Sequence, residues 1–525
     1  MQELHSLIHC LTCSEWQALQ GYFTCFTEHD PAKLKYAQLA KMLMDAEECP
    51  ADVSCCLKIY GVKSDSNFEK LKSRLREKIL DFLLTDISAD KQKELDEADY
   101  AIIKMKKKSA QFQQLFYSKK RMPLLYGLLD EIIVQAKKYE QYSILVDHLR
   151  LKKALAGLKI GREEFEKIDV AMQTALLCLS LANKAEHFYY KLIISGDFSG
   201  KQDKQKTLQA LKQNIAEVQA GFELTNSPMI HYYLKNLEMG YYQLQEDYLR
   251  ARSVCLELSN IVRNNKSVRR KQRLAVVYDN LSRCEFYLGN FEEAATCARD
   301  AQIYFNQGSE NYCIALEQEF YALFALKQYR QSSDIATKMI TSAARKELGE
   351  FRHSKYHYLL ANTFFMQRDF EGALGILSEK REISTDKAGW ETGARILTIM
   401  TLIEMLKLDE ASLAIYGLKQ FFKRTDKKTL VSKRDKTILN LLLILERAGF
   451  RFGSLNGSTE KHLITLGSPE EETRWEPFTS ELIPFHKWMS GKMGGRTKTH
   501  GDGKEKAPIL VPSKSKAAAE KFLSR

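Results

Sequence analysis

Apolar residues recur along most of the chain at steps of three and four, the spacing that lines up one face of an α-helix. Between residues 66 and 84 the apolar positions form one such stripe: Phe68, Leu71, Leu75, Ile79 and Phe82. Only 9 prolines and 26 glycines interrupt the pattern in 525 residues, and both residue types are unfavourable inside helices. The pattern therefore predicts an all-α protein.

Short breaks of similar composition divide this helical pattern between about residues 229 and 422. Each break is a tight turn, followed by an aromatic residue or leucine and then, three positions later, by a small residue. The five pairs are Tyr248 and Ala251, Phe291 and Ala294, Tyr329 and Ser332, Phe370 and Ala373, and Leu408 and Ala411. Successive pairs lie 38 to 43 residues apart, a period typical of stacked helix pairs.

The unit from residue 278 to residue 301 explains why this spacing matters. Four of its residues share one face of the expected second helix: Phe291, Ala294, Ala298 and Ala301. Small side chains on that face let the preceding helix approach closely. Gly289 and Asn290 suit the end of the preceding helix, because both tolerate the left-handed backbone conformation.

This unit resembles a tetratricopeptide repeat (TPR), and residues 358–377 give a second good match. Other units depart from the family pattern, with Glu319 where a leucine is expected and Ser332 in place of alanine. Their intervals also exceed the family period of about 34 residues. The resemblance covers about residues 229–422. It implies a right-handed solenoid of antiparallel helix pairs, whose first helices line a concave surface.

The pattern predicts five parts along the chain. They are a helical N-terminal cap domain (1–100), a region of divergent helix pairs (101–228), TPR-like repeats (229–450), a C-terminal docking segment (451–489) and a disordered basic tail (490–525). We expect Ser14 to cap a helix in the first part. The amino end also resembles those of uncharacterised bacterial helical-repeat proteins, a likeness that implies no activity.

Charge and cysteine usage refine this picture without changing it. The net charge is +12, but nine lysines and arginines against three acids after residue 489 put half of that excess on the tail. Eleven irregularly spaced cysteines fit reduced, mostly buried thiols. No apolar run approaches the length of a membrane span, and the amino end lacks a secretory signal. We therefore expect a soluble, cytoplasmic protein with no membrane partner.

No motif of a known catalytic site is present: the chain has no phosphate-binding loop, dinucleotide fingerprint, zinc-protease helix or nucleophile elbow. We expect no enzymatic activity and no cofactor. One zinc-like run exists at the amino end, formed by His5, His9, Cys10 and Cys13. Structural zinc sites usually pair two separated ligand clusters, so we favour ordinary helix positions and no metal.

The leading hypothesis is a scaffold or adaptor that binds a peptide or protein partner on the concave face of the solenoid. If the TPR resemblance holds, seven residues face that groove: Asp279, Arg283, Tyr287, Glu317, Tyr321, Tyr358 and Asn362. Ordinary packing between repeats is an equally good explanation for the tyrosines.

The alternative hypothesis is a nucleic-acid-associated regulator that uses a basic cluster, Lys104 to Arg121, together with the basic tail. Seven basic residues and no acid occur between residues 101 and 129: Lys104, Lys106, Lys107, Lys108, Lys119, Lys120 and Arg121. Phe112, Phe116 and Tyr117 lie among them, and such a combination can hold a phosphate backbone and stack bases. We favour a solvated helix face, because aromatic residues at helical spacing usually belong to a core.

Overall fold

The computed structural model describes residues 1–25, 34–85, 95–118, 122–194, 201–343, 349–379, 389–425, 431–455, 457–468 and 473–493. Across these ranges every regular element is a helix, which confirms the predicted all-α fold. None of the helices in these ranges is both long and apolar enough to span a bilayer. The predicted disordered tail lies outside the described residues from position 494 onward. The chain divides into two compact units, residues 1–176 and 177–525.

The first unit contains two helical cores. Its helices are α1 (Gln2–His9), α2 (Cys13–Thr24), α3 (Lys35–Met44), α4 (Asp52–Tyr60), α5 (Ser66–Thr85), α7 (Glu97–Ser118), α8 (Met122–Lys138), α9 (Tyr142–Lys159) and the first half of α10 (Arg162–Ile194). The predicted stripe of α5 is confirmed, since all five of its apolar residues are buried.

The expected cap at Ser14 is wrong by two residues. Helix α2 begins at Cys13, and the Thr12 hydroxyl accepts a hydrogen bond from the Glu15 backbone N–H. The Glu15 carboxylate in turn accepts from the Thr12 backbone N–H at 2.8 Å. This reciprocal capping box satisfies two backbone donors at once, which a cap at Ser14 does not.

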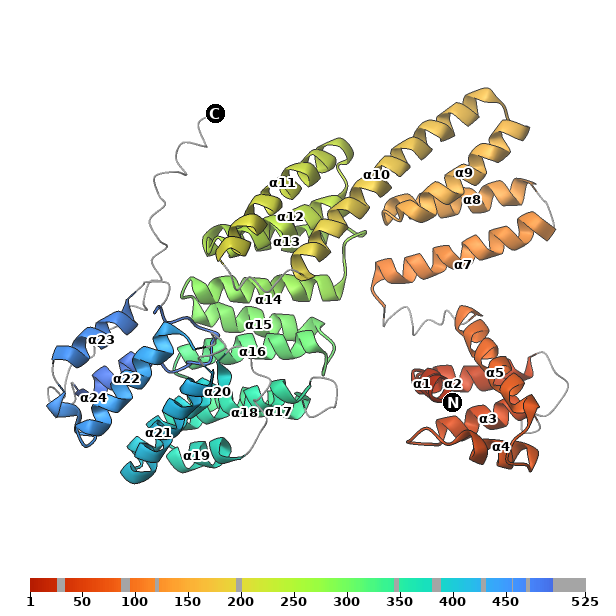
Figure 1. The fold of residues 1–525 in the computed structure, drawn as a ribbon. Coiled ribbons are helices and arrows are strands. Elements are labelled where there is room, and N and C mark those ends of the chain that lie inside the picture. The colour runs from red at the N-terminus through yellow and green to blue at the C-terminus, as the bar shows by residue number, and fades with distance from the viewer. Residues whose placement is uncertain are drawn as a thin grey trace, which may run out of the picture. The chain divides into compact units, whose positions relative to one another are not determined.

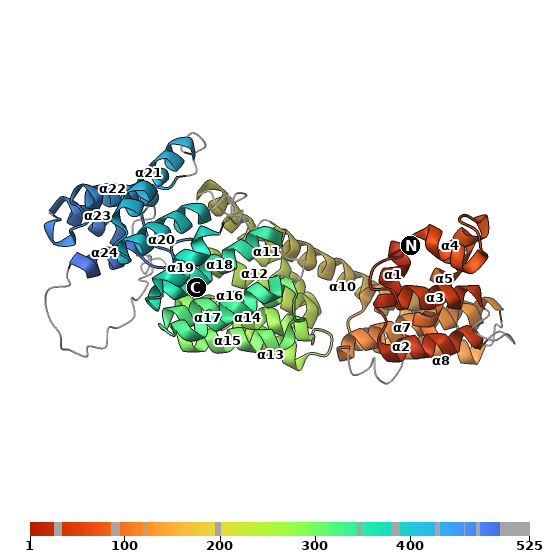
Figure 2. The ribbon, with the colours of Figure 1, turned by 90° about the horizontal axis from the view of Figure 1, so that it is seen from below.

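The second unit is a series of helix pairs followed by a C-terminal segment. Its elements are the remainder of α10, then α11 (Lys201–Thr225), α12 (Pro228–Leu244), α13 (Tyr248–Asn264), α14 (Lys271–Tyr287), α15 (Phe291–Tyr304), α16 (Glu310–Ala325), α17 (Tyr329–Ala343), α18 (Gly349–Met366), α19 (Phe370–Ser378), α20 (Trp390–Glu404), α21 (Leu408–Thr425), α22 (Lys433–Arg447), η3 (Phe452–Ser454), α23 (Gly457–Gly467) and α24 (Phe485–Met493). Each helix from α11 to α21 packs against the next, and α12 to α18 lie side by side (Figures 1 and 2). We call the even-numbered helices α12 to α20 the A helices and the odd-numbered helices α13 to α21 the B helices.

The five predicted breaks mark the starts of the five B helices. These helices begin at Tyr248, Phe291, Tyr329, Phe370 and Leu408, and the small residue three positions later is fully buried in all five. The buried small residues let each B helix lie close to its A helix. This part of the chain folds as TPR-like helical repeats, as the sequence predicts.

A left-handed residue lies two positions before each B helix. The five residues are Glu246, Gly289, Lys327, Arg368 and Leu406, with φ between 58° and 83°. The next backbone N–H then donates to a carbonyl five residues back, as from Asn290 to Glu285 at 2.9 Å. This bond satisfies an otherwise unpaired carbonyl at the end of the A helix.

The same turn also occurs among the described residues of the first unit, where sequence reasoning missed it. Glu140 has a φ of 50°, the Gln141 N–H donates to the Ala136 carbonyl at 2.8 Å, and α9 begins at Tyr142. Leu145 stands where the other turns carry a small residue, and it is buried. The bulkier residue hides this turn from a search for the small-residue pattern.

Glu319, the poorest match to the family pattern, is buried in this fold as a paired carboxylate. It is 5% exposed and accepts hydrogen bonds from Arg299 Nη1 at 3.3 Å and from Gln302 Nε2 at 2.7 Å. Both partners come from the preceding B helix, α15. A buried carboxylate is tolerated when it is paired and hydrogen-bonded, so the register of α16 needs no shift.

Replacing Leu406 by glycine is expected to stabilise the second unit. Leu406 has a φ of 58° and is 79% exposed, so its side chain strains the backbone and contributes little packing. Relieving a left-handed leucine is expected to raise the free energy of unfolding by about 1 kcal/mol. The matched control is Leu413→Gly, an exposed position inside α21, which should lower it by about 1 kcal/mol. Urea unfolding measures both, and equal signs for the two variants would contradict the turn geometry.

Candidate functional site

A strap of the chain's own residues, 473–484, crosses the A helices of the second unit. It connects α23 to α24 and has no helical structure of its own. Phe478 contacts aromatic residues of α14 and α16, and the Ser480 carbonyl accepts a hydrogen bond from Tyr358 of α18. At its start Arg474 lies 3.4 Å from the Glu246 carboxylate, in the turn before α13. The strap therefore lies in the surface that the sequence predicts as the partner groove.

Phe478 occupies a cage of three aromatic rings. Its ring centroid lies 4.6 Å from that of Phe286, 5.6 Å from that of Tyr287 and 4.6 Å from that of Tyr321. Tyr287 is itself held by stacking on Tyr248, at 4.1 Å between centroids. Phe478 has a φ of 63°, unusual for a bulky residue, so the contacts with the cage compensate for a strained backbone.

Ser480 makes the closest approach of the strap to an A helix. The Tyr358 hydroxyl donates to its carbonyl at 2.5 Å. Gly393 of α20 packs against the same residue. A Cβ atom at position 393 would lie 2.5 Å from the Ser480 carbonyl oxygen. A cavity of about 20 Å³ remains between strap and helices, lined in part by Tyr358 and Asn362, which is room for about one water molecule.

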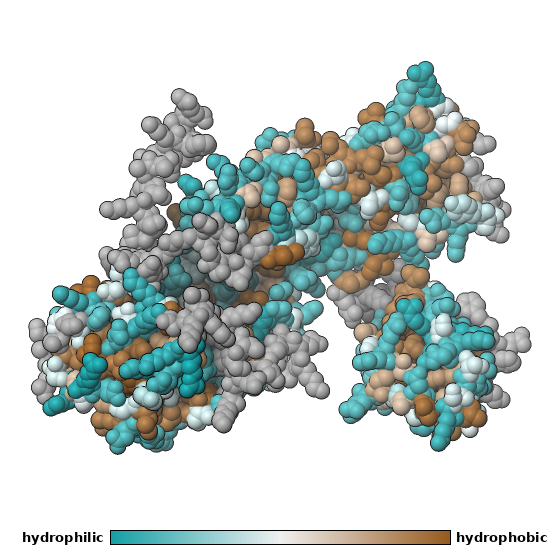
Figure 3. Space-filling view, in the orientation of Figure 1, coloured by the Kyte–Doolittle hydropathy of each residue, from teal (hydrophilic) through white to brown (hydrophobic). Residues whose placement is uncertain are grey.

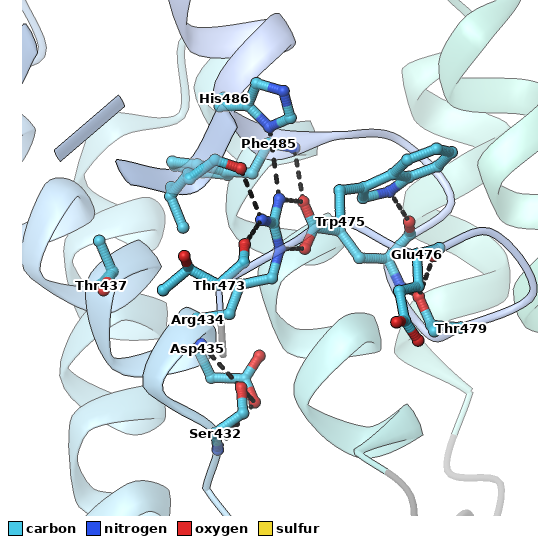
Figure 4. Close-up of polar contacts among 12 residues, drawn as sticks. Ser432, Arg434, Asp435, Thr437, Thr473, Trp475, Glu476, Thr479, Phe485 and His486 are labelled. Atoms are coloured by element: carbon cyan, nitrogen blue, oxygen red, sulfur yellow. Dashed lines mark hydrogen bonds and ion pairs between the residues drawn. The ribbon is translucent and has the colours of Figure 1, made fainter. Parts of the chain in front are cut away.

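Arg434, at the start of α22, holds both ends of the strap (Figure 4). Its side chain is buried and forms a bidentate ion pair with Glu481, at 2.5 and 2.8 Å. Its Nη1 donates to the carbonyls of Leu466, at the end of α23, and Thr473, at 2.8 and 2.5 Å. The planar guanidinium thus satisfies four acceptor atoms at once, which lysine cannot do.

Three further hydrogen bonds belong to this network. The Glu481 carboxylate accepts from the Phe485 N–H at 2.8 Å, so it caps α24. Trp475 Nε1 donates to the Glu481 carbonyl at 2.7 Å, which joins the start of the strap to its end. Burial, with a smaller contribution from Arg434, lowers the pKa of His486 to about 4. The imidazole is therefore neutral at pH 7, and its Nδ1 accepts from Arg434 at 3.3 Å.

The seven predicted groove residues fall into three groups. In the first group, the strap contacts Tyr287, Tyr321 and Tyr358. Asn362 belongs with them, because it lines the small cavity beneath the strap. Glu317 is already engaged, with Lys355 Nζ at 2.5 Å and the Tyr356 hydroxyl at 2.8 Å. Arg283 is exposed, whereas Asp279 is half-buried as a residue and its Oδ1 atom is fully buried.

Two polar atoms of these residues lack a hydrogen-bond partner in the described part of the chain. They are Asp279 Oδ1 and the Tyr321 hydroxyl. Burial raises the pKa of Asp279 to about 6, with Arg283 opposing the rise and Glu317 adding to it. Unsatisfied buried polar groups are rare in folded proteins and commonly mark a site that something else completes.

Sequence reasoning predicted a docking segment over residues 451–489, but it did not predict that part of this segment, the strap, contacts Tyr287, Tyr321 and Tyr358. Phe478, Ser480 and Glu481 stand in a stretch without helical periodicity, and Arg434 looks like an ordinary polar residue of α22. One signal was available, since the large aromatic residues Trp475 and Phe478 stand close to a proline, outside any helical pattern. Large aromatic residues outside helices need a surface to cover them.

The structure describes four of the seven basic residues in the predicted cluster of the first unit, and two of these four are already paired. Lys104 and Lys106 are exposed, whereas Lys107 donates to the Thr85 carbonyl at 3.1 Å and Lys108 pairs with Glu131. Phe112 is buried in the core, which leaves Tyr117 as the exposed ring. Three members lie outside the described residues: Lys119, Lys120 and Arg121. No described feature favours nucleic-acid binding over a solvated helix face.

The histidines of the amino end bind backbone groups. His5 Nε2 lies 3.0 Å from the Ala46 carbonyl and His9 Nε2 lies 3.0 Å from the Leu43 carbonyl. Cys10 and Cys13 are exposed. Among the described residues, no three histidine, cysteine or acidic side chains converge as metal ligands would. The two imidazoles satisfy carbonyls at the end of α3.

Exposed apolar side chains also occur on α10 and α11 of the second unit, where apolar surface is visible in Figure 3. Tyr190, Ile193 and Ile194 lie at the end of α10, and Leu224 lies at the end of α11, beside the middle of α10. These positions do not form one continuous patch, so the surface that the strap covers is the stronger candidate site.

Comparison with known proteins gives similarity to solved structures alone. No protein-family model matches the chain, and no curated protein matches it. Among solved structures it is similar to a signal transduction ATPase with numerous domains (STAND) protein with a tetratricopeptide repeat sensor from Pyrococcus horikoshii. The two are 13% identical, the match covers 81% of this chain and 65% of that one, and the TM-score is 0.37. The chain thus spans just under two thirds of that protein's length.

Asp279→Asn is expected to stabilise the protein in a pH-dependent way. Because the folded-state pKa is raised from 3.8 to about 6, ionisation of Asp279 opposes folding, and its cost is fully present above pH 6. The shift corresponds to about 3 kcal/mol at pH 7.5. The asparagine variant should gain up to this amount there, and the gain should shrink as the pH falls from 6 to 4. Urea unfolding across this range measures it, and a gain that grows towards pH 4 would contradict the burial of the carboxylate.

Arg434→Met is expected to free the strap and α24. The substitution leaves the Glu481 carboxylate buried without its partner, which typically costs about 3 to 5 kcal/mol. Hydrogen exchange of residues 473–493 should quicken while exchange in α14 to α18 stays slow. The matched control is Arg447→Met, an exposed position on the same helix. Unchanged exchange in the Arg434 variant would show that the strap is held by other contacts.

Proposed function

We propose that this protein is an interaction scaffold whose A-helix groove binds an extended segment of a partner protein. By A-helix groove we mean the surface that α14, α16, α18 and α20 present to the strap. One observation carries the proposal: the groove already holds an extended protein segment, the strap. It does so through an aromatic cage and through a hydrogen bond to the backbone of the bound segment.

The chemistry of the groove fits a protein segment. The cage accepts an aromatic side chain. The Tyr358 hydroxyl donates a hydrogen bond to a backbone carbonyl, a group that every residue of a peptide supplies. Asp279 Oδ1 accepts a hydrogen bond and the Tyr321 hydroxyl can donate one, and the strap satisfies neither. A polypeptide carries both donors and acceptors along its length. A partner segment therefore completes the groove better than the strap does.

Capture of a partner should depend on Arg283, the exposed cation of the groove. In a native pull-down from the cells that produce the protein, Arg283→Glu should lose a partner that the unaltered chain retains. Arg330→Glu, an exposed position on a B helix, is the matched control and should retain it. The partner should stay bound after nuclease treatment and at high salt, because burial of an aromatic side chain depends on neither nucleic acid nor charge. A captured partner that both variants retain, or that nuclease removes, would overturn groove binding.

A further inference from the structure

The tip of the strap, residues 474–480, is held differently from its ends. Both ends meet at the buried Arg434, through the Thr473 carbonyl and the Glu481 carboxylate. The tip reaches the A helices through the Phe478 ring and through one hydrogen bond to the Ser480 carbonyl. Its ion pairs, between Arg474 and both Glu246 and Glu476, are partly exposed, and such pairs contribute little.

Loss of the tip from the groove would therefore leave the anchored ends intact. The Arg434–Glu481 pair, the cap of α24 and the Trp475–Glu481 bond all lie outside the cage. Release of the tip also relieves the left-handed backbone of Phe478. The tip is thus an occupant that can leave and return without unfolding the C-terminal helices.

We propose that the tip is a resident copy of the partner's recognition segment, and that the partner enters the groove by displacing it. The proposal rests on the groove function above and names the partner's chemistry. The segment is extended, carries an aromatic side chain in the place of Phe478, and has a small residue two positions later. The requirement for a small residue follows from the close packing of Gly393 against Ser480, which leaves no room for a larger side chain.

Competition explains how a partner prevails over a tethered tip. A tethered segment has a high effective concentration, on the order of millimolar for short linkers. A free segment must make additional bonds to compete, and Asp279 Oδ1 and the Tyr321 hydroxyl provide them. The strap thus sets a minimum affinity for the partner. Segments that contribute an aromatic ring alone bind too weakly to displace the tip, whereas a segment that also pairs with these two groups displaces it.

The experiment uses the full chain and a synthetic peptide that copies residues 473–484, TRWEPFTSELIP, with a fluorescent label. Phe478→Ala removes the resident anchor and should open the cage. Fluorescence anisotropy should show saturable binding to this variant and at least tenfold weaker binding to the unaltered chain. A peptide with alanine in place of its phenylalanine should bind the variant at least tenfold more weakly.

A second variant locates the binding in the groove. Gly393→Ala, combined with Phe478→Ala, places a Cβ where the peptide backbone must pass and should abolish binding. Gly417→Ala in the same background is the matched control, because a Cβ there meets nothing within 4 Å. Both substitutions favour helix, so neither should unfold the chain, and circular dichroism checks this.

Hydrogen exchange of the unaltered chain tests displacement directly. The peptide copies the strap and makes no additional bond, so it should displace the tip only above the effective concentration of the tethered segment. At peptide concentrations well above about 1 mM, exchange at residues 474–480 should quicken while that of α24 stays unchanged. Equal peptide affinity for the unaltered chain and the Phe478→Ala variant would overturn displacement and leave groove binding standing. No binding to the Phe478→Ala variant would overturn the recognition pattern, whereas an Arg283-dependent partner in the pull-down would still support the scaffold function.

Discussion

The C-terminal part of the structure depends on one buried side chain, Arg434, whose guanidinium group must be hydrogen-bonded. An unpaired cation at the position of Arg434 would cost several kcal/mol, and the chain satisfies it with atoms from three places: the end of α23, the start of the strap and Glu481. These segments have no apolar periodicity that would direct them to one another. Their shared donor brings them together, and it thereby fixes where the strap enters and leaves the A-helix groove.

The aromatic surface of the groove accounts for the position of the strap. A stack of helix pairs leaves the face of its A helices uncovered, and here that face carries aromatic rings that a monomeric protein would not leave in water. Phe478 covers them, and Tyr358 and Gly393 fit the backbone that follows. The fit is incomplete, because Asp279 and Tyr321 retain unsatisfied polar atoms. A purely structural plug would be expected to satisfy them, and this difference supports the proposal that the groove is a binding site.

The sequence predicted those features that depend on residues close together in the chain. Phe291 and Ala294 marked the start of a B helix because three-residue spacing is local. The left-handed turns were found only at Gly289; at Leu406 and Arg368 the stack imposes the same conformation on residues that do not prefer it. The sequence predicted a docking segment at residues 451–489 but not its contacts, because these are distant, with separations of 122 residues from Tyr358 to Ser480 and 47 from Arg434 to Glu481. A single sequence carries no periodic signal for such pairs.

The departures from the family pattern also have a structural role. Arg252 of α13 pairs with the buried Glu285 of α14, and Arg299 of α15 pairs with the buried Glu319 of α16. Both pairs join a B helix to the next A helix. A buried ion pair is satisfied in only one rotation of its helix, whereas apolar contacts tolerate several. Tyr321 lies two residues, about 200° around the helix, from Glu319. Fixing Glu319 against α15 therefore turns Tyr321 towards the strap, so the residue that weakened the resemblance is the one that orients the groove.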